Sequence, residues 1–224
     1  MGKDASVTPK ATLTVKDITN PKGATAAGLA TFKLKKGDVN ASLALTDQTV
    51  KNVKTLKDVV ATVDYRAPRL RGVVLNSKYE FATKKYQVGA TWDGQLLEKP
   101  STIKLWYTNK DNLAAGEATV GVARGQKANV TFNQKKVLTA KYTLAKGDFT
   151  YEPSYNFVRS APAVAVSKKQ GKELFKLAYD LKSEVASLEW THKPLKVTVA
   201  SVVSKDLKVA KPSVSAVFEN VYSF

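Results

Sequence analysis

The side chains that most often carry out catalysis or bind metals are almost missing from this chain. It has 224 residues, no cysteine and a single histidine, His192, in the segment WTHKP. Metal sites and nucleophilic triads need several converging groups, so His192 alone predicts a loop residue. Gly116, Gly121 and Gly125 do not follow a strand and open a helix, so they do not form a phosphate-cradling loop. We therefore expect no catalytic residue, no metal site, no cofactor and no enzyme activity.

The charged residues that recur at regular spacing are basic. Lys and Arg number 36 against 19 Asp and Glu, and the formal net charge is +17. Such an excess attracts anions, whether nucleic acid, anionic lipid, or small phosphates and carboxylates. Many of these residues share the polar face of an alternating segment, where they would raise the local concentration of anions. On this face we place Lys33, Lys35, Arg66, Lys104, Lys127, Lys141, Lys176, Lys182 and Lys196, with the acids Glu152 and Glu189.

The elements that would position these charges are short segments in which apolar and polar residues alternate. Tyr86, Val88, Ala90 and Trp92, for example, are separated by Gln87, Gly89 and Thr91. Successive side chains of a strand point to opposite faces, so each segment has one apolar and one polar face. Fourteen segments show the pattern clearly, and two weaker ones lie at 77–83 and 161–168.

The connections between these segments are short. KKGD at 35–38, ARGQ at 123–126 and AKGD at 145–148 are typical of hairpin turns in which glycine supplies a positive φ. Pro153 and Pro162 fall in or beside strand-like segments, where we expect a bulge or a strand end. No change in composition divides the chain, so we expect one antiparallel domain over residues 1–224, with a flexible N-terminus at 1–8.

Two architectures fit this pattern, a soluble β-sandwich and a membrane barrel. No apolar run approaches the roughly 20 residues of a membrane helix, so only a closed barrel could span a bilayer. Small residues at many apolar positions suit a face in contact with lipid better than a packed core. Aromatic residues near segment ends suit the two membrane interfaces: Tyr65, Trp92, Tyr107, Tyr142 and Trp190.

The competing function is a soluble basic β-domain that binds nucleic acid. Such a domain needs aromatic residues among Lys and Arg on one exposed face. Most aromatic residues of this chain share the parity of the apolar residues, opposite the lysines. Trp106, beside Lys104, is an exception.

Three stretches resemble the 24-kDa outer-envelope pore protein family of plastids. They are KYTLAKGDFTYEPSYNF at 141–157, AVSKK at 165–169, and ASLEWTHK followed by KVTVASVV over 186–203. The specific likeness covers about the last third of the chain. Upstream, only the hairpin layout matches, with EKP at 98–100 before a strand that carries Ile103, Leu105 and Tyr107.

The resemblance implies an all-β fold, a single closed antiparallel transmembrane β-barrel in the plastid outer envelope membrane. We expect 12 to 16 strands, with 14 preferred, joined by short hairpin turns. It also implies passive diffusion of small hydrophilic solutes: sugars, phosphorylated sugars, phosphate, dicarboxylates, amino acids and nucleotides. The expected partners are membrane lipid and small anionic and neutral metabolites rather than nucleic acid, and a homo-oligomer is compatible with this. A barrel that serves only as an envelope structural protein would have the same sequence pattern.

Overall fold

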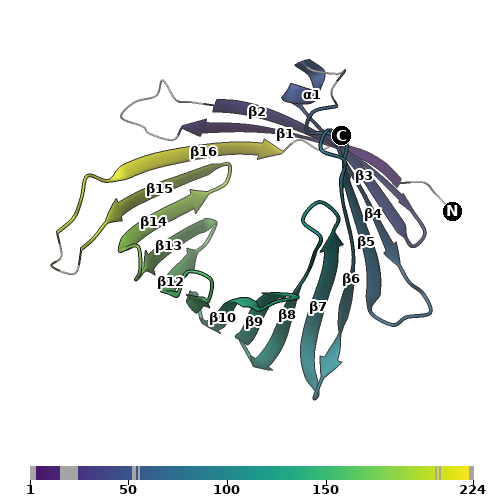
Figure 1. Ribbon diagram of the computed structural model, residues 1–224. Coiled ribbons are helices and arrows are strands. Elements are labelled where there is room, and N and C mark those ends of the chain that lie inside the picture. The colour runs from purple at the N-terminus through teal and green to yellow at the C-terminus, as the bar shows by residue number, and fades with distance from the viewer. Residues whose placement is uncertain are drawn as a thin grey trace.

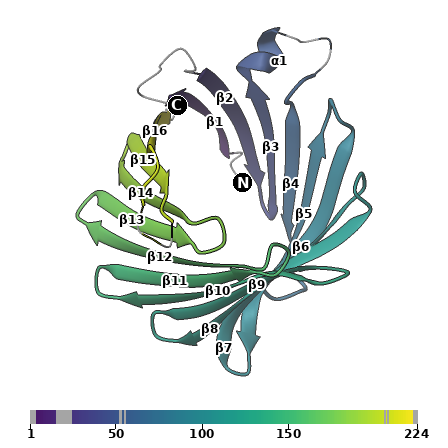
Figure 2. The ribbon, with the colours of Figure 1, turned by 60° about the vertical axis from the view of Figure 1, so that its left-hand side comes forward.

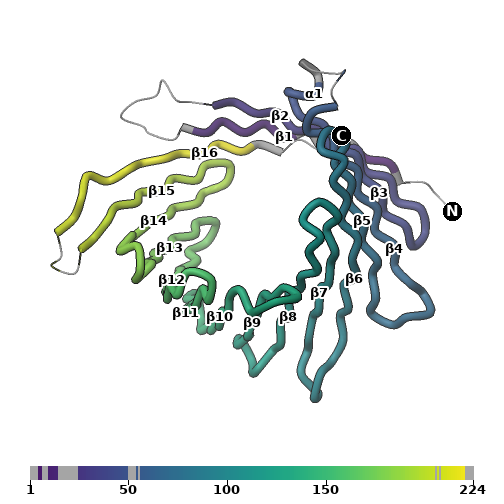
Figure 3. The backbone as a smooth tube through the Cα atoms, in the orientation of Figure 1, coloured from purple at the N-terminus to yellow at the C-terminus, as the bar shows by residue number. Residues whose placement is uncertain are grey.

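The computed structural model describes residues 4–15, 25–51, 54, 56–204, 206 and 208–221. In this part of the chain, sixteen strands form one closed antiparallel barrel, in which each strand pairs with its neighbours in the sequence (Figure 1). The backbone trace follows the ring strand by strand, and β16 returns beside β1 (Figure 3). The strands are β1 Asp4–Val15, β2 Thr25–Lys36, β3 Val39–Thr46, β4 Val60–Arg66, β5 Val73–Glu80, β6 Lys85–Leu96, β7 Lys99–Thr108, β8 Leu113–Ala123, β9 Gln126–Asn133, β10 Val137–Lys146, β11 Phe149–Asn156, β12 Ala161–Gln170, β13 Glu173–Asp180, β14 Val185–His192, β15 Leu195–Val202 and β16 Ser213–Val221.

The alternating segments of the sequence account for these strands. Each of the fourteen clear segments coincides with a strand, apart from an end residue in some of them, and the weaker segment at 161–168 lies in β12. The other weaker segment, 77–83, overlaps β5 only as far as Glu80. The expected closed antiparallel barrel is therefore confirmed, at the upper limit of the expected 12 to 16 strands, and the preferred value of 14 is two too low. Residues Asp4 to Thr8, which we expected in a flexible N-terminus, belong to β1 and pair with β2.

The short turns depend on glycine at three of the expected positions. Gly37, Gly125 and Gly147 have φ values of 58°, 73° and 58°. This left-handed conformation carries no steric penalty for glycine, whereas other residues lose about 1–2 kcal/mol in it. The KKGD, ARGQ and AKGD turns thus join β2 to β3, β8 to β9 and β10 to β11 as expected.

Pro153 does not mark a bulge or a strand end, contrary to our expectation. It lies inside β11, and the register between β10 and β11 is the same on both sides of it. The pairing of β11 with β12 is continuous through Pro153 and Pro162. The ladder is interrupted only toward β10, between the Lys141–Ser154 and Leu144–Tyr151 pairs. One missing N–H donor is therefore accommodated without a shift of register. The register shifts of the described residues lie instead in the β9–β10 and β8–β9 pairings.

The two ends of the barrel differ in the length of their connections. One end, the short-turn rim, consists of residues 37–38, 67–72, 97–98, 124–125, 147–148, 171–172 and 193–194. The other, the long-turn rim, includes the described residues 47–51, 54, 56–59, 203–204, 206 and 208–212. The short helix α1, Asp47–Lys51, lies at this rim beyond the end of β3 (Figure 2).

The described residues contain almost no buried apolar core. Only Val59, Ala115 and Ala161 are buried apolar residues, and no large side chain is fully buried. Large apolar side chains are instead exposed all around the barrel, for example Leu177 at 56%. A soluble domain of this length would enclose a close-packed interior. Among the described residues, no helix is long and apolar enough to cross a membrane.

Candidate functional site: the inner wall of the barrel

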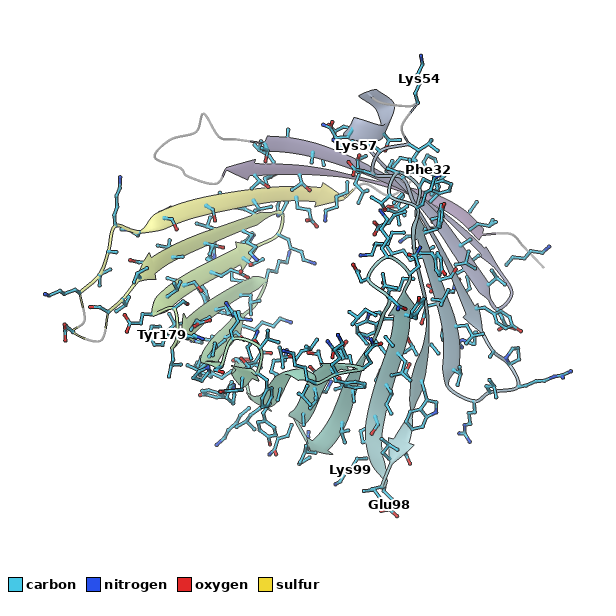
Figure 4. The ribbon with its side chains drawn as sticks, viewed as in Figure 1. Phe32, Lys54, Lys57, Glu98, Lys99 and Tyr179 are labelled. Carbon is cyan, nitrogen blue, oxygen red and sulfur yellow. The ribbon has the colours of Figure 1, made fainter. Side chains whose placement is uncertain are left out.

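The apolar face of the sheet is the outer face. Tyr179, which belongs to it, lies on the outside of the wall, as Figure 4 shows. Across the sheet Tyr179 pairs with Val164 and Ala186, so these residues face outward as well. Because side chains alternate along a strand, the polar residues between them face the interior. The interior of the barrel is therefore polar and its exterior is apolar.

The strand positions of the expected lining residues place all but one of them on the inner wall. Lys182 is the exception, because β13 ends at Asp180 and Lys182 lies in the turn at the long-turn rim. There its Nζ donates a hydrogen bond to the carbonyl of Arg159. The expected lining residues that lie on the inner face are Lys33, Lys35, Arg66, Lys104, Lys127, Lys141, Glu152, Lys176, Glu189 and Lys196.

Glu152 of β11 joins two lysines within a group of four neighbouring strands, β10 to β13. Its Oε1 accepts a hydrogen bond from Lys141 Nζ of β10, and its Oε2 accepts one from Lys176 Nζ of β13, both at 3.2 Å. The span is possible because the β12 residue directly opposite Glu152 on this face is the small Ala165. One carboxylate thus faces two cations, and the cluster keeps a net positive charge.

The remaining acids of the inner wall each contact a lysine or a polar neighbour. Glu189 Oε2 lies 2.5 Å from Lys196 Nζ. Glu117 Oε2 lies 3.7 Å from Lys104 Nζ, while its Oε1 accepts a hydrogen bond from Asn129 at 2.7 Å. Glu117 was not among the expected lining residues, although it shares their parity.

A second ion pair that was not expected from the sequence lies between β1 and β16, the two strands that close the barrel. Lys10 Nζ of β1 is 2.6 Å from Glu219 Oε2 of β16. Parity would place both on the polar face, but their contact depends on the pairing of the first strand with the last, which no local pattern encodes.

Lys33 and Lys35 lie together in a polar hollow of about 370 Å³. Ser6, Asn40 and Ser42 line the same hollow, and Asp64 is its acidic member. Both lysines are exposed, and within the described part of the chain neither forms an ion pair. An anion at this position would meet two ammonium groups with hydroxyl and amide donors beside them.

Side-chain hydrogen bonds connect the polar residues from β3 to β6. Asn76 Nδ2 donates to Asp64 Oδ1 at 2.8 Å, and Thr91 Oγ1 donates to Asn76 Oδ1 at 2.9 Å. The hydroxyls of Ser42 and Thr62 lie 2.6 Å apart. These contacts give this side of the inner wall a fixed arrangement of donors and acceptors.

The expected interfacial aromatics all lie on the outer face, and they divide between the two ends. Tyr65, Trp92, Tyr142 and Trp190 are close to the short-turn rim, and Tyr107 is close to the long-turn rim. Further outer-face tyrosines complete the second group, namely Tyr79, Tyr86, Tyr155 and Tyr179. Two aromatic bands with aliphatic residues between them match the interfacial girdles of membrane barrels.

His192 is not a loop residue, contrary to our expectation, because β14 extends to include it. It lies on the outer face, opposite Glu173. Its Nδ1 is 3.5 Å from Glu173 Oε1. In the described residues, no group of three or more His, Asp or Glu side chains could hold a metal ion.

Solved structures of a bacterial porin share the fold of this barrel. A variant of Rhodopseudomonas blastica porin with five substitutions matches with a TM-score of 0.62 and 7% identity over 100% of both chains. A triple variant of the same porin has a TM-score of 0.58 and 6% identity, over 98% of this chain and 100% of that one. No curated protein sequence matches the chain.

The family comparison agrees with the geometry of the barrel. A family described as outer envelope pore protein 24 matches residues 10–220, which is most of the chain. A barrel with an apolar exterior and a polar interior fits the outer envelope membrane of plastids, the location that we expected. The chain belongs to the outer envelope pore protein 24 family.

Proposed function

We propose that the barrel is a passive channel for small hydrophilic solutes and that its inner wall favours anions. A pore through the outer envelope follows from the family and the fold. The preference for anions rests on one observation, which is the excess of cations on the inner wall. Lys141 and Lys176 share a single acid, and Lys33, Lys35 and Lys127 have no ion pair in the described part of the chain. Fixed positive charge along a water-filled passage raises the concentration of anions within it.

The proposed solutes are phosphorylated sugars, phosphate, dicarboxylates, amino acids and nucleotides. Most of these carry phosphate or carboxylate groups, which ammonium groups bind through charge-assisted hydrogen bonds. The hollow around Lys33 and Lys35 has the donors for such a contact. Neutral solutes would pass as well, because the described inner wall also carries hydroxyl and amide groups that can hydrogen-bond to uncharged molecules.

The test is single-channel recording of the refolded full chain in a planar bilayer with a salt gradient across it. We expect stable conductance and a reversal potential of anion-selective sign. The triple variant K33Q/K35Q/K127Q should shift the reversal potential toward cations. The matched control is K54Q/K99Q/K168Q, which removes the same charge from positions beyond the strands or on the outer face (Figure 4 labels Lys54 and Lys99).

Three other results would count against the proposal. Equal shifts in both triple variants would show that net charge, and not the inner wall, sets the preference. Conductance without an anion preference would keep the pore and remove its selectivity. Silence of a folded, inserted barrel would favour a structural role in the envelope.

A further inference from the structure

Trp106 is the one aromatic residue on the inner face of the strands that the structure describes. It follows Lys104 on β7, and it pairs with Gly89 of β6 and Ala115 of β8. The other aromatic residues in the described strands lie on the outer face. An indole on a wall of hydroxyls, amides and charges is not needed for a polar passage, and so it calls for an explanation of its own.

Gly89 leaves the space that Trp106 occupies. A Cβ atom at Gly89 would lie 2.3 Å from the carbonyl oxygen of Leu105 and 3.1 Å from the Cβ of Trp106. No larger residue fits there unless the neighbouring strand moves. An aromatic residue next to a glycine commonly covers the exposed backbone of a sheet. Trp106 nevertheless remains only half-buried, so part of its side chain stays accessible from the interior.

The accessible part of Trp106 borders a hollow of about 310 Å³. This volume is at the lower end of the range of about 300 to 1,000 Å³ for small-molecule sites. Lys78 and Lys104 are exposed on its wall, and Lys104 is only loosely held, since its Nζ lies 3.7 Å from Glu117 Oε2. Lys78 Nζ lies 2.8 Å from Glu80 Oε1, so a bound phosphate would share this ammonium group with that carboxylate. Gln87 and Thr91 line it too, and Asp64 is occupied by its hydrogen bond from Asn76.

We propose that Trp106 is a stacking platform that makes the channel retain phosphate anions carrying a ring, with Lys78 and Lys104 holding the phosphate. A flat base or the apolar face of a sugar would lie against the indole, and neighbouring amide and hydroxyl groups would contact the polar edge. Base–aromatic stacking is worth about 1–3 kcal/mol per base by alanine substitution. Trp106 therefore determines specificity among the anions that the inner wall attracts. The inference refines the proposed function, because it assumes that solutes enter the barrel.

The experiment measures binding and not conduction, so the two proposals fail separately. Adenosine monophosphate, ribose 5-phosphate and inorganic phosphate are each titrated by calorimetry into the full chain refolded in detergent micelles. W106L keeps an apolar side chain over Gly89 but removes the flat ring, and W106F keeps a smaller ring. W92L changes a tryptophan of the outer face and is the matched control.

We expect W106L to raise the Kd for adenosine monophosphate about five-fold or more, the lower end of what stacking provides. W106F should cause a smaller increase, W92L none, and inorganic phosphate should bind all variants alike. If W106L also binds ribose 5-phosphate more weakly, the site accepts sugar rings as well. If its affinity for ribose 5-phosphate is unchanged, the site is restricted to bases. The inference is overturned if the wild-type chain does not bind adenosine monophosphate, if W106L binds it like the wild type, or if W106L weakens inorganic phosphate equally.

Discussion

Glu152 shows how a single residue can tune the charge of the inner wall. It offers one carboxylate to Lys141 and Lys176, and all three side chains stay partly exposed to the interior. Two unit charges about 4 Å apart interact by about 1 kcal/mol in water, and salt weakens this further. Glu152 therefore offsets only part of the positive charge that a passing ion meets.

Removal of this carboxylate should make the channel more selective for anions. We expect E152Q to raise the anion-to-cation permeability ratio by at most about five-fold, the factor that corresponds to about 1 kcal/mol. K176Q should lower the ratio. Both are measured as reversal potentials under a salt gradient. E173Q removes a carboxylate from the outer face and is the control. A shift of equal size in E173Q, or opposite signs for E152Q and K176Q from those expected, would contradict the assignment.

Parity placed the expected lining residues on the inner face, except for Lys182, but it did not give their partners. Alternation along a strand places Lys141 and Glu152 on the polar face without knowledge of any neighbour. The pairing of Lys104 with Glu117 requires the register between β7 and β8. Lys182 was misplaced because the alternation continues past Asp180, whereas the strand ends there. Local patterns fix a residue's face, while register and strand ends depend on the turns.

At the scale of elements, the two strands with weak patterns explain the difference between fourteen and sixteen. In β5, Ser77 occupies an outer position between Val63 and Val88, which interrupts the apolar row. In β12, Ala163 and Ala165 occupy inner positions, which interrupts the polar row. Both strands form because their neighbours supply the complete pairing on each side. A count of alternating segments in a single sequence therefore misses strands in which small residues replace the apolar residues of the outer face or the polar residues of the inner face.

An added charge should affect stability differently on the two faces of β13. Leu177 is an exposed outer residue between Val166 and Leu188, and Ala178 is the next residue, on the inner face. An arginine on a lipid-facing strand costs about 2–4 kcal/mol near the bilayer midplane. We expect L177R to lower the free energy of unfolding in lipid vesicles by about this amount, and A178R to change it little. Denaturant titration in vesicles measures both. Equal stability of the two variants would show that water, and not lipid, covers the outer face.

At the scale of the whole molecule, the structure is stable only where lipid contacts the outer face and water contacts the inner face. The described residues supply no packed interior, and large apolar side chains cover the exterior. In water such a continuous surface would drive association, whereas a bilayer covers it. Closure of the ring lets the backbone N–H and C=O groups at the outer edges of β1 and β16 pair with each other. A sheet can cross a membrane only if these groups are paired. Closure could be expected from the sequence, but its register could not, because β1 and β16 lie at opposite ends of the chain.

The register of closure can be tested directly, because the chain has no native cysteine. Leu13 of β1 lies opposite Phe218 of β16. Paired Cα atoms in antiparallel strands are about 4.5–5.5 Å apart, which is within the disulfide range of about 4.4–6.8 Å. We expect L13C/F218C to form an intramolecular disulfide on mild oxidation, detected by mass spectrometry and by mobility without reductant. L13C/V214C is the control, since Val214 is four residues from Phe218 on the same strand, about 13 Å away. Equal cross-linking in the control would mean that the two strands slide, and cross-linking in neither variant would mean that the barrel opens between its first and last strands.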